Sequence, residues 1–559
     1  MSTQPAPRWD AAWREHTWQA LGQPWDVLVV GGGITGAGVL REAVRVGMRA
    51  LLVERRDFAW GTSSRSSKLV HGGLRYLAQG QVRLLRASVR ERERLLQHVP
   101  GLVEPLGFLF ATYRGDHPGR LAMHVGLAAY DLFAHRWLHR RHPRPDFEML
   151  APHIAQHRLD GGFGYYDAQT DDARLVLRLL REAAADGAVA LNQVAAGGPV
   201  HEDGALAGLL LFDRLSGRSR VARARVVVNA TGVWADGLRG QVGAPPRLRA
   251  QRGSHLVFPS GRLPVPQAVS FLHPHDRRPV FVFPWQGVTL VGTTDLDHDR
   301  PLGREPAIGA EEVAYLMAAV ESRFPALGLT LDDVLASFAG VRPVIDGGRD
   351  EPGQESREHA VWEENGLLTV TGGKLTTFRL MALDALRAAR RRRPELPEPT
   401  SDALVFRPAP AAHPLLDALP PPVRTRLAGR YGAEAALVAE AAAPGELQPV
   451  PGTETLWAEL RWAARAEAVV HLDDLLLRRT RLGLLLRGHG LGAAQAERVR
   501  ALCRQELGWD DARWAEEAAA YRELCRRCYG LPPRETIPHW RAPCTETAPG
   551  EHRASPTLA

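Results

Sequence analysis

Apolar and polar positions divide the chain into a first part in which strands and helices alternate and a last part that is helical. Residues 26–30 form a short, β-branched apolar run that predicts a buried strand. Residues 34–46 place Ala, Val and Leu at helical spacing, and residues 50–54 form a second apolar run. This order predicts a strand–helix–strand unit in which the two strands are parallel.

The same pattern continues along the chain. Residues 172–193 predict a helix and then a strand, and residues 221–230 predict an apolar strand. Residues 250–295 alternate apolar and polar positions between prolines, which is typical of an antiparallel sheet that could form a separate substrate platform. Residues 367–371 predict a last strand, followed by a helix over 372–393.

We therefore predict an α/β (α+β) fold with a Rossmann-like dinucleotide-binding domain, an interleaved antiparallel-sheet substrate domain and a C-terminal all-helical domain. The boundaries that we expect are a leader over 1–23, the two interleaved parts over 24–395, the helical domain over 396–540 and a disordered tail over 541–559. Prolines at 394, 397 and 399 mark the linker between the two larger parts.

The turn after the first strand carries the strongest chemical signal. Gly31, Gly33 and Gly36 match G-x-G-x-x-G, in which the glycines permit a tight turn, close approach of a pyrophosphate and close packing of the helix on the strand. The helix N-terminus there offers unpaired N–H groups to phosphates. Glu54 lies 23 residues after Gly31, near the spacing expected of an acid that bonds a ribose hydroxyl. NAD and FAD both fit this unit.

Composition narrows the class of protein. The chain has 559 residues with 45% hydrophobic and 24% charged positions, ordinary values for a globular protein of more than one domain. No uncharged apolar stretch is long enough to span a membrane, and residues 1–23 lack the apolar core of a secretory signal, so we expect a cytoplasmic protein. Four cysteines near the C-terminus form no disulfide framework, and we predict no metal site.

The net charge of +7 comes almost entirely from arginine, because lysine occurs only at Lys68 and Lys374. In a chain that otherwise uses arginine, a lysine suggests a site that needs a compact ammonium group. A lysine can also remain in such a chain by chance. The basic residues are spread along the chain without an aromatic-basic module, which argues against nucleic-acid binding. An anionic substrate or an anionic membrane surface explains the charge better.

A second motif follows Glu54. Residues 61–67 are rich in Ser, Thr and Gly, which cannot pack a core but can bring hydroxyl and backbone donors against a polar ligand. Lys68, His71, Arg75 and Tyr76 are concentrated just beyond these residues. A plain surface loop is therefore the weaker interpretation.

This motif, Gly-Thr-Ser-Ser-x-Ser-Ser-Lys-Leu-x-His-Gly-Gly-Leu-Arg-Tyr-Leu, resembles the aerobic, FAD-dependent glycerol-3-phosphate dehydrogenase family. Matching elements recur at 171–175, 229–234, 253–255, 292–295, 340–343, 372–377 and, more faintly, 477–483. The resemblance spans about residues 25 to 490. It implies FAD as a non-covalent cofactor and oxidation of sn-glycerol 3-phosphate to dihydroxyacetone phosphate, with the C2 hydride passing to flavin N5 and the electrons to a membrane quinone.

The resemblance also assigns site residues. It implies His71, His255, Arg342 and Lys374 as catalytic candidates, because a histidine of near-neutral pKa suits base work and arginine and lysine suit an anionic substrate. It implies Arg75 and Tyr76 as a phosphate-binding pair, together with Arg342 and Lys374. The residue that accepts the C2 hydroxyl proton stays open.

The expected FAD contacts combine the glycine turn with the later motifs. They are Gly31, Gly32, Gly33, Ile34, Thr35, Gly36, Glu54, Thr62, Ser63, Ser64, Ser67, Lys68, Ala230, Thr231, Gly232, Gly372, Gly373, Lys374, Leu375 and Thr376.

Three alternatives remain. An oxygen-using glycerol-3-phosphate oxidase has no distinguishing signature on the acceptor side. An amine or amino-acid oxidase of the same flavin superfamily would need a carboxylate-binding arginine but no phosphate clamp. A non-catalytic flavoprotein would keep the 31–36 turn but would not need the Arg75, His255, Arg342 and Lys374 set.

A quinone acceptor would require contact with the bilayer at the inner face of the cell membrane. Residues 121–142 predict an apolar helix that ends in a basic, Trp-containing patch. A core helix is the preferred interpretation, and a membrane-interface helix is the alternative. In the latter case we expect Leu127, Tyr130, Phe133, Trp137 and Leu138 to face lipid. A homodimer is also left open.

Overall fold

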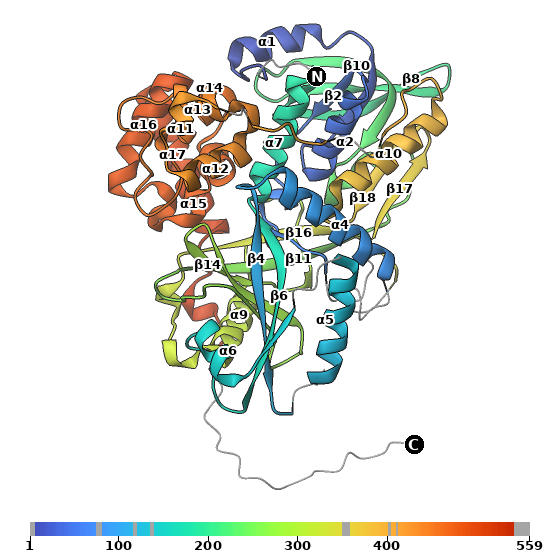
Figure 1. Cartoon of the computed structure of the whole chain (residues 1–559). Helices are drawn as coiled ribbons and strands as arrows, with labels where there is room; N and C mark the ends of the chain where they lie inside the picture. Colours follow the sequence, from blue (N-terminus) through green and yellow to red (C-terminus); the bar gives the residue numbers. More distant parts are fainter. Residues whose placement is uncertain are drawn as a thin grey trace, which may run out of the picture.

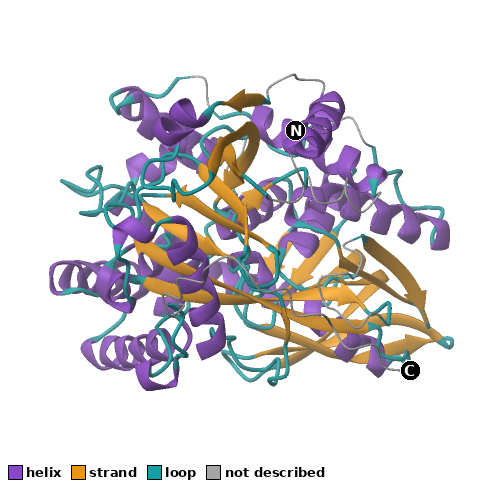
Figure 2. Ribbon diagram, turned by 90° about the horizontal axis from the view of Figure 1, so that it is seen from below, coloured by secondary structure: helices purple, strands orange, loops and turns teal. Residues whose placement is uncertain are grey.

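The computed structural model describes residues 6–73, 81–115, 120–134, 139–348, 358–400, 404–409 and 412–541. Within these residues the chain forms two sheets, one above the other in Figure 1, and a group of C-terminal helices beside them. Figure 2 shows the same molecule from below, with most helices at the periphery of the strands.

The first sheet has the order β17-β18-β10-β1-β2-β7, and its strands from β18 to β7 are parallel. In β1, Val27, Leu28 and Val29 are fully buried because elements cover both faces of the sheet. The strands are β1 Trp25–Val30, β2 Ala50–Val53, β7 Val189–Leu191, β8 Val194–Glu202, β9 Ala205–Asp213, β10 Ser219–Asn229, β17 His359–Glu364 and β18 Leu367–Gly372. The helices of this half are α1 Ala11–Ala20, α2 Ile34–Arg45, α7 Asp172–Ala185, α8 Ala235–Gln241 and α10 Phe378–Arg392. The predicted strand–helix–strand unit is confirmed.

The second sheet has the order β15-β11-β14-β13-β12-β4-β6-β3 and is antiparallel except where β12 meets β4. The antiparallel sheet predicted over 250–295 is part of it. Its strands are β3 Leu69–Val70, β4 Val103–Tyr113, β5 Arg140–His142, β6 Leu159–Thr170, β11 Leu248–Pro259, β12 Ala268–Leu272, β13 Pro279–Trp285, β14 Val288–Gly292, β15 Leu296–Asp297 and β16 Ala336–Ile345. The helices of this half are α4 Val82–His98, α5 Arg120–Ala134, α6 Arg144–Leu150 and α9 Ala310–Arg323.

The C-terminal part is helical, as the pattern predicts. Its elements are α11 Pro414–Asp417, α12 Pro421–Tyr431, α13 Ala435–Glu440, α14 Trp457–Ala466, the π-helix Asp474–Arg479, α15 Leu482–Leu485, α16 Ala493–Leu507 and α17 Asp511–Cys528. Leu460 and Leu476 of this part share a hydrophobic core with Phe283 and Phe338 of the second sheet.

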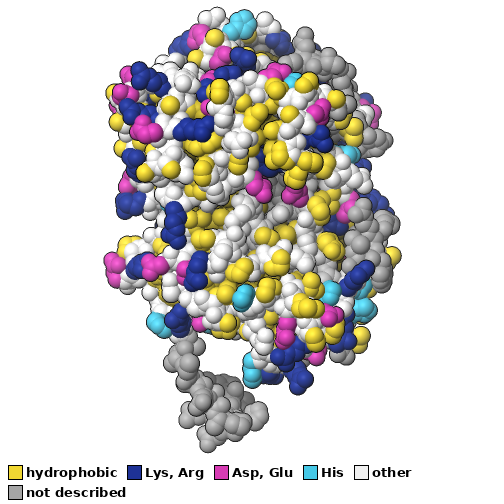
Figure 3. All heavy atoms as spheres, turned by 60° about the vertical axis from the view of Figure 1, so that its left-hand side comes forward, with side chains coloured by type: hydrophobic (Ala, Val, Ile, Leu, Met, Phe, Trp, Pro, Cys, Tyr) yellow, Lys and Arg dark blue, Asp and Glu magenta, His cyan; other side chains and the backbone are white. Residues whose placement is uncertain are grey.

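On the face in Figure 3, basic and acidic side chains alternate along the left edge and do not segregate.

A buried ion-pair network joins the C-terminal helices to the first sheet. Asp57 accepts hydrogen bonds from Arg478 at 2.5 Å and from Arg479 at 2.7 and 2.8 Å. All three side chains are at most 1% exposed. Burial alone would raise the pKa of Asp57, but the two guanidinium groups hold it well below its usual range. The carboxylate therefore stays charged and paired.

A second part of this network lies behind the Ser-rich loop. Asp172, at the start of α7, accepts hydrogen bonds from Lys68 at 3.1 Å, from the Ser66 hydroxyl at 2.7 Å and from Arg481. Lys68 and Arg481 also donate to the carbonyl of Ser64 at 3.1 and 3.0 Å. Motifs 171–175 and 477–483 are thus in contact, since Arg481 also pairs with Asp171.

The prediction of one helix over residues 121–142 is wrong for the C-terminal half of this range. Helix α5 ends at Ala134, and residues 140–142 form strand β5, which pairs with β6. Two of the side chains expected to face lipid do not do so: Leu127 and Tyr130 are 0% and 1% exposed, because they pack against the second sheet and α4, and Phe133 is partly buried beside Tyr130. Trp137 and Leu138 lie outside the described residues. The exposed large apolar side chains of α5 are Leu121, Val125 and Leu132.

Across the part of the chain that the structure describes, no helix combines the length and apolar character that a membrane span requires. Residues 6–23 contain α1, whose Trp18 is buried, and Trp9 is buried just before it. Most of the tail predicted over 541–559 lies outside the described residues.

We predict that Asp57→Ala strongly destabilises the protein. The substitution removes the carboxylate that pairs with Arg479 and leaves Arg478 with only Asp473 and Asp474, and breaking a buried pair of this kind costs about 3–5 kcal/mol in free energy of unfolding. Chemical denaturation followed by circular dichroism measures this difference. The matched control is Glu15→Ala, which removes the exposed pair with Arg218 and should leave the denaturation midpoint unchanged. Equal midpoints for the two variants would contradict a stabilising role of the network.

Candidate functional site

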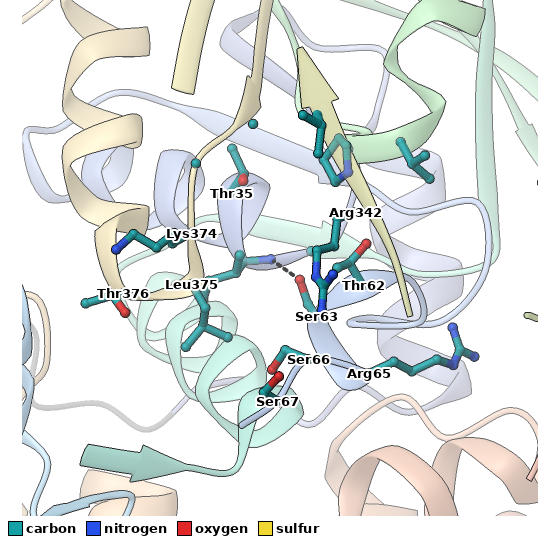
Figure 4. Close-up of a pocket in the computed structure, with 18 of the residues that line it drawn as sticks. Thr35, Thr62, Ser63, Arg65, Ser66, Ser67, Arg342, Lys374, Leu375 and Thr376 are labelled. Carbon is teal, nitrogen blue, oxygen red and sulfur yellow. Dashed lines mark hydrogen bonds between the residues drawn. The ribbon is translucent and has the colours of Figure 1, made fainter. Parts of the chain in front are cut away.

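The glycine turn connects β1 to α2 in a conformation that only glycine tolerates. Gly31 has a φ of +113°, and a Cβ at Gly36 would lie 1.9 Å from the Gly31 carbonyl oxygen. The first turn of α2 is held by Ser63, whose Oγ accepts a hydrogen bond from the Ile34 N–H at 2.9 Å (Figure 4). The helix N-terminus therefore faces a cavity beside the Ser-rich loop.

Glu54 follows β2, as the spacing predicts, and lines this cavity. Its carboxylate accepts hydrogen bonds from the N–H groups of Gly32 at 2.8 Å and Arg56 at 2.7 Å. Burial raises the pKa of Glu54, and these two bonds oppose the rise. Glu54 thus ties the glycine turn to the end of the second strand.

Two further loops line the same cavity at the carboxyl ends of parallel strands. Ala230, Thr231 and Gly232 follow β10, and the 372–376 loop follows β18. Gly372 and Gly373 have φ values of +76° and +67°, which let the chain turn sharply there. Ligands bind at this edge in open α/β sheets.

The Ser-rich loop has a cavity side and a rear side. Thr62, Ser63 and Ser67 line the cavity, as expected. Ser64 and Lys68 are not in the lining, and the same holds for Gly32 and Gly36. The structure places Lys68 in the buried network, where burial, with Arg481, lowers its pKa to about 8 against the opposing effect of Asp172. Its ammonium group supports the loop from behind.

The cavity is large enough for a dinucleotide and a small substrate together. Its volume is about 1590 Å³, above the range of roughly 300–1,000 Å³ that drug-sized ligands occupy. The expected FAD contacts that line it are Gly31, Gly33, Ile34, Thr35, Glu54, Thr62, Ser63, Ser67, Ala230, Thr231, Gly232, Gly372, Gly373, Lys374, Leu375 and Thr376. The glycine turn, the helix N-terminus and the hydroxyl donors fit a pyrophosphate-containing cofactor.

One arm of the cavity is cationic. Arg342, on β16, pairs with Asp295 at 3.3 Å and donates to the Thr293 hydroxyl at 3.2 Å. Figure 4 shows its guanidinium group near Thr62 and Ser63, with Lys374 and Thr376 across the pocket. His71 also lines the cavity. The expected residues Arg75 and Tyr76 lie outside the described residues.

His255 does not line the cavity but lies directly behind its wall. Its Nε2 is 3.0 Å from the hydroxyl of Ser67, and its ring stacks on Phe338 at 4.6 Å. Burial lowers the pKa of His255 well below its usual value, and the charges of Arg342 and Lys68 lower it further. A neutral His255 therefore reaches the cavity through Ser67.

The structure adds residues that the sequence analysis missed. Arg278 lines the cavity and donates to the carbonyl of Asp295 at 2.8 Å, so two arginines are anchored on Asp295. Asp295 belongs to a motif already noted, whereas no motif marks Arg278.

Arg65 also lines the cavity and lies within the Ser-rich loop. It pairs with Glu305 and donates to the hydroxyl of Tyr529 at 3.3 Å. Tyr529, just after α17, donates to Glu305 at 2.6 Å. The C-terminal part thus touches the wall of the cofactor cavity. Cys503, Cys525 and Cys528 of this part are buried free thiols, and Cys528 donates to the carbonyl of Glu305 at 3.5 Å.

A parallel sheet with this glycine turn and a cavity of this size defines a dinucleotide-dependent oxidoreductase. The family model of FAD dependent oxidoreductases matches residues 26–379, and that of the C-terminal domain of alpha-glycerophosphate oxidase matches residues 394–514. The chain belongs to the FAD-dependent oxidoreductase family and, within it, to the aerobic glycerol-3-phosphate dehydrogenases. The family named from the sequence motifs is confirmed.

Comparison with individual relatives supports the same family. The aerobic glycerol-3-phosphate dehydrogenase of Staphylococcus aureus is 36% identical over 379 residues, which cover 66% of this chain and 68% of the relative. The structure of glycerol-3-phosphate dehydrogenase from Bacillus halodurans, complexed with FAD, is 28% identical with a TM-score of 0.75 and covers 93% of this chain and 98% of that chain. The L-alpha-glycerophosphate oxidase of Mycoplasma pneumoniae, at 18% identity and a TM-score of 0.55 over 70% of this chain and 100% of that one, shares the fold.

We predict that the buried, neutral ring of His255 makes the free energy of unfolding fall in acid. The folded protein keeps this ring neutral, whereas the unfolded chain takes up a proton below about pH 6.5. The unfolded state then binds more protons, so the free energy of unfolding falls as the pH drops below about 6.5, by up to about 1.4 kcal/mol per pH unit.

Denaturation curves across this pH range measure the effect. His255→Gln keeps a partner for Ser67 but cannot take up the proton, so its loss of stability in acid should be smaller than that of the wild type. His201→Gln, at an exposed position, is the control and should follow the wild type. Parallel curves for wild type and His255→Gln would contradict the neutral assignment.

Proposed function

We propose that the protein oxidises sn-glycerol 3-phosphate to dihydroxyacetone phosphate and passes the electrons to a membrane quinone. The observation that carries the proposal is the position of Arg342, Lys374 and Arg278 in the same cavity as the cofactor loops. Three cations suit a substrate with a phosphate dianion. FAD, when bound, supplies the two-electron acceptor for the hydrogen at C2.

Arg342 and Lys374 divide the binding of the anion. The guanidinium of Arg342 is oriented by Asp295 and Thr293, so its planar fork is fixed before substrate arrives. Lys374 lies at the start of the short 3-10 helix Leu375–Thr377 and offers a compact charge. Arg278 donates to the backbone carbonyl of Asp295, whose carboxylate pairs with Arg342, and it adds a second cation on this side of the cavity.

The C2 hydroxyl proton needs an acceptor at the cavity wall. His71 lines the wall, and the neutral ring of His255 is reached through the Ser67 hydroxyl. We assign the acceptor role to His71 and a positioning role to His255, because only His71 is part of the lining. A histidine base contributes typically 10²–10⁴-fold to such a step.

Dye-linked turnover of glycerol 3-phosphate tests the proposal, and we predict that Arg342→Ala lowers kcat/KM by about 10- to 100-fold. A charge-assisted hydrogen bond contributes about 1.5–3 kcal/mol, and the variant loses it. Arg225→Ala, on the exposed part of β10, is the control and should match the wild type. Wild-type kinetics in Arg342→Ala, or no turnover by the wild type, would refute the assignment.

The same preparations test the alternatives. Acid denaturation should release FAD to the supernatant, because we propose a non-covalent cofactor. Oxygen as sole acceptor should support little turnover, whereas an oxidase would use it. Glycine and other amines should not be oxidised, since an amino-acid oxidase does not need three cations in its cavity.

We further propose that the protein binds the anionic inner face of the cell membrane through the outer side of α5 and strand β5. Leu121 and Leu132 are 77% and 66% exposed on α5, and Arg140 and Arg141 are exposed on β5. Apolar side chains next to cations suit the headgroup boundary, where each cation contributes about 1 kcal/mol.

We predict that Leu132→Glu and Arg140→Glu each weaken co-sedimentation with anionic vesicles. The first places a charge among acyl chains, and the second repels the anionic surface. High salt should weaken binding of the wild type. Leu215→Glu, an exposed leucine next to β9, is the control and should bind as the wild type does. Unchanged binding by both test variants would place the contact elsewhere.

A further inference from the structure

The wall of the cavity contains a buried carboxylate that the proposed mechanism does not use. Asp167, on β6, lines the cavity and is 5% exposed. A carboxylate is costly to bury unless it is paired and hydrogen-bonded, so the partners of Asp167 indicate what it does.

The partners of Asp167 come from three other elements. Its Oδ1 accepts hydrogen bonds from the guanidinium of Arg92 on α4 at 2.7 Å and from the backbone N–H of Gly72 at 3.0 Å. The hydroxyl of Tyr130, on α5, lies 3.0 Å from each carboxylate oxygen. Arg92 and Tyr130 are themselves buried. Two helices therefore hold the carboxylate, and the carboxylate holds the chain at Gly72.

Gly72 directly follows His71, the residue to which we assign the C2 hydroxyl proton. Strands β3 and β6 are antiparallel, with Leu69 opposite Gln169 and Val70 opposite Ala168. Continued by one residue, this register sets His71 opposite Asp167, at the point where β3 ends. Just beyond it, the Gly72 N–H bonds the Asp167 side chain in place of a neighbouring strand.

The backbone is thus fixed on both sides of the His71 ring. The carbonyl of His71 accepts a hydrogen bond from the Thr376 hydroxyl at 3.4 Å, and the next N–H is held by Asp167. Packing adds to this restraint, because a Cβ at Gly72 would lie 2.3 Å from the Tyr130 hydroxyl oxygen.

The donors behind Asp167 also fix one another. Arg92 donates to the Tyr130 hydroxyl at 2.8 Å and to the carbonyl of Tyr166 at 3.2 Å. A fully connected buried network of this kind is rigid, and so is the carboxylate that it carries.

We propose that Asp167 is a positioning residue that fixes His71 at the cavity wall by holding the backbone of Gly72. The proposal rests on the proposed function, because it deepens the role of His71 as proton acceptor. A general base must lie within roughly 2.6–3.2 Å of the atom whose proton it takes. A displacement of about 1 Å can cost about 100-fold in rate, so the anchoring of this backbone sets how well the base works.

Asp167→Ala tests the anchor. We expect kcat for dye-linked turnover of glycerol 3-phosphate to fall about 100-fold, because His71 is no longer held in place. KM should stay within about twofold, since Arg342 and Lys374 still bind the anion. Asp167→Asn keeps an oxygen for the Gly72 N–H and should restore kcat at least about tenfold over the alanine variant. Equal losses in the two variants would overturn the proposal.

A double-mutant cycle shows whether Asp167 acts through His71. In a His71→Ala background, Asp167→Ala should cause no further loss of kcat, because the group that it positions is absent. A further loss of about 100-fold would overturn the proposal. If Asp167→Ala does not fold, Tyr130→Phe replaces it in the cycle. That variant keeps the Arg92 pair, and kcat should fall about fivefold with His71 present and remain unchanged without it.

Asp213→Ala is the matched control. Asp213 is also a buried aspartate on a strand that accepts hydrogen bonds from an arginine, Arg14, and from a backbone N–H, that of Leu215. It lies at the end of β9, outside the cavity lining. Its kcat should match that of the wild type, and a loss as large as that of Asp167→Ala would show that any buried aspartate has this effect.

Hydrogen exchange of the Gly72 amide, followed by mass spectrometry, tests the anchor without turnover. Exchange should be at least about tenfold faster in Asp167→Ala than in the wild type or Asp167→Asn. If the wild type does not oxidise glycerol 3-phosphate but Asp167→Ala speeds this exchange, the substrate assignment fails and the anchor stands. If the wild type turns over while exchange is the same in the wild type and Asp167→Ala, the anchor fails and the substrate assignment stands.

Discussion

The carboxylate of Asp172 has buried cationic and hydroxyl donors on several sides, and the position of the cofactor loop depends on it. Lys68 and Ser66 come from the loop itself, whereas Arg481 comes from the C-terminal part, more than 300 residues away in sequence. Removing the carboxylate would leave the buried ammonium group of Lys68 without its ion-pair partner, which is far more costly than losing an exposed pair. The loop conformation and the docking of the C-terminal helices are therefore set together.

This arrangement gives neighbouring residues of one short loop different tasks. Ser63 bonds the first turn of α2, and Ser67 faces the cavity with His255 behind it. Between them, the Ser64 carbonyl receives two cationic donors from the rear. A run of small hydroxyl residues suits both tasks, because each side chain is short enough to leave the backbone within reach of a ligand on one side and of buried charges on the other.

Sequence patterns predicted the glycine turn, Glu54, the two sheets and most of the cavity lining, because each depends on local rules of turn geometry and apolar periodicity. They could not predict that Ser67 faces the cavity whereas Lys68 faces the buried network, since these neighbouring residues share one motif but lie on opposite sides of the loop. Arg278 lay outside every motif, and only the pairing of β13 with β14 brings it to the cavity. The end of α5 was missed because residues 140–142 are recruited as an edge strand by β6, a long-range pairing that helical spacing does not reveal.

The contact between Arg65 and Tyr529 bears on how the protein is made. Residues 24–60 of the first sheet leave the ribosome early, and such segments can begin to fold as they emerge. Arg65 nevertheless obtains its full set of partners only when Glu305 and then Tyr529 have been synthesised. A nascent or prematurely terminated chain therefore carries the glycine turn without a completed Ser-rich loop. The wall of the cofactor cavity at Arg65 is therefore complete only in the finished polypeptide.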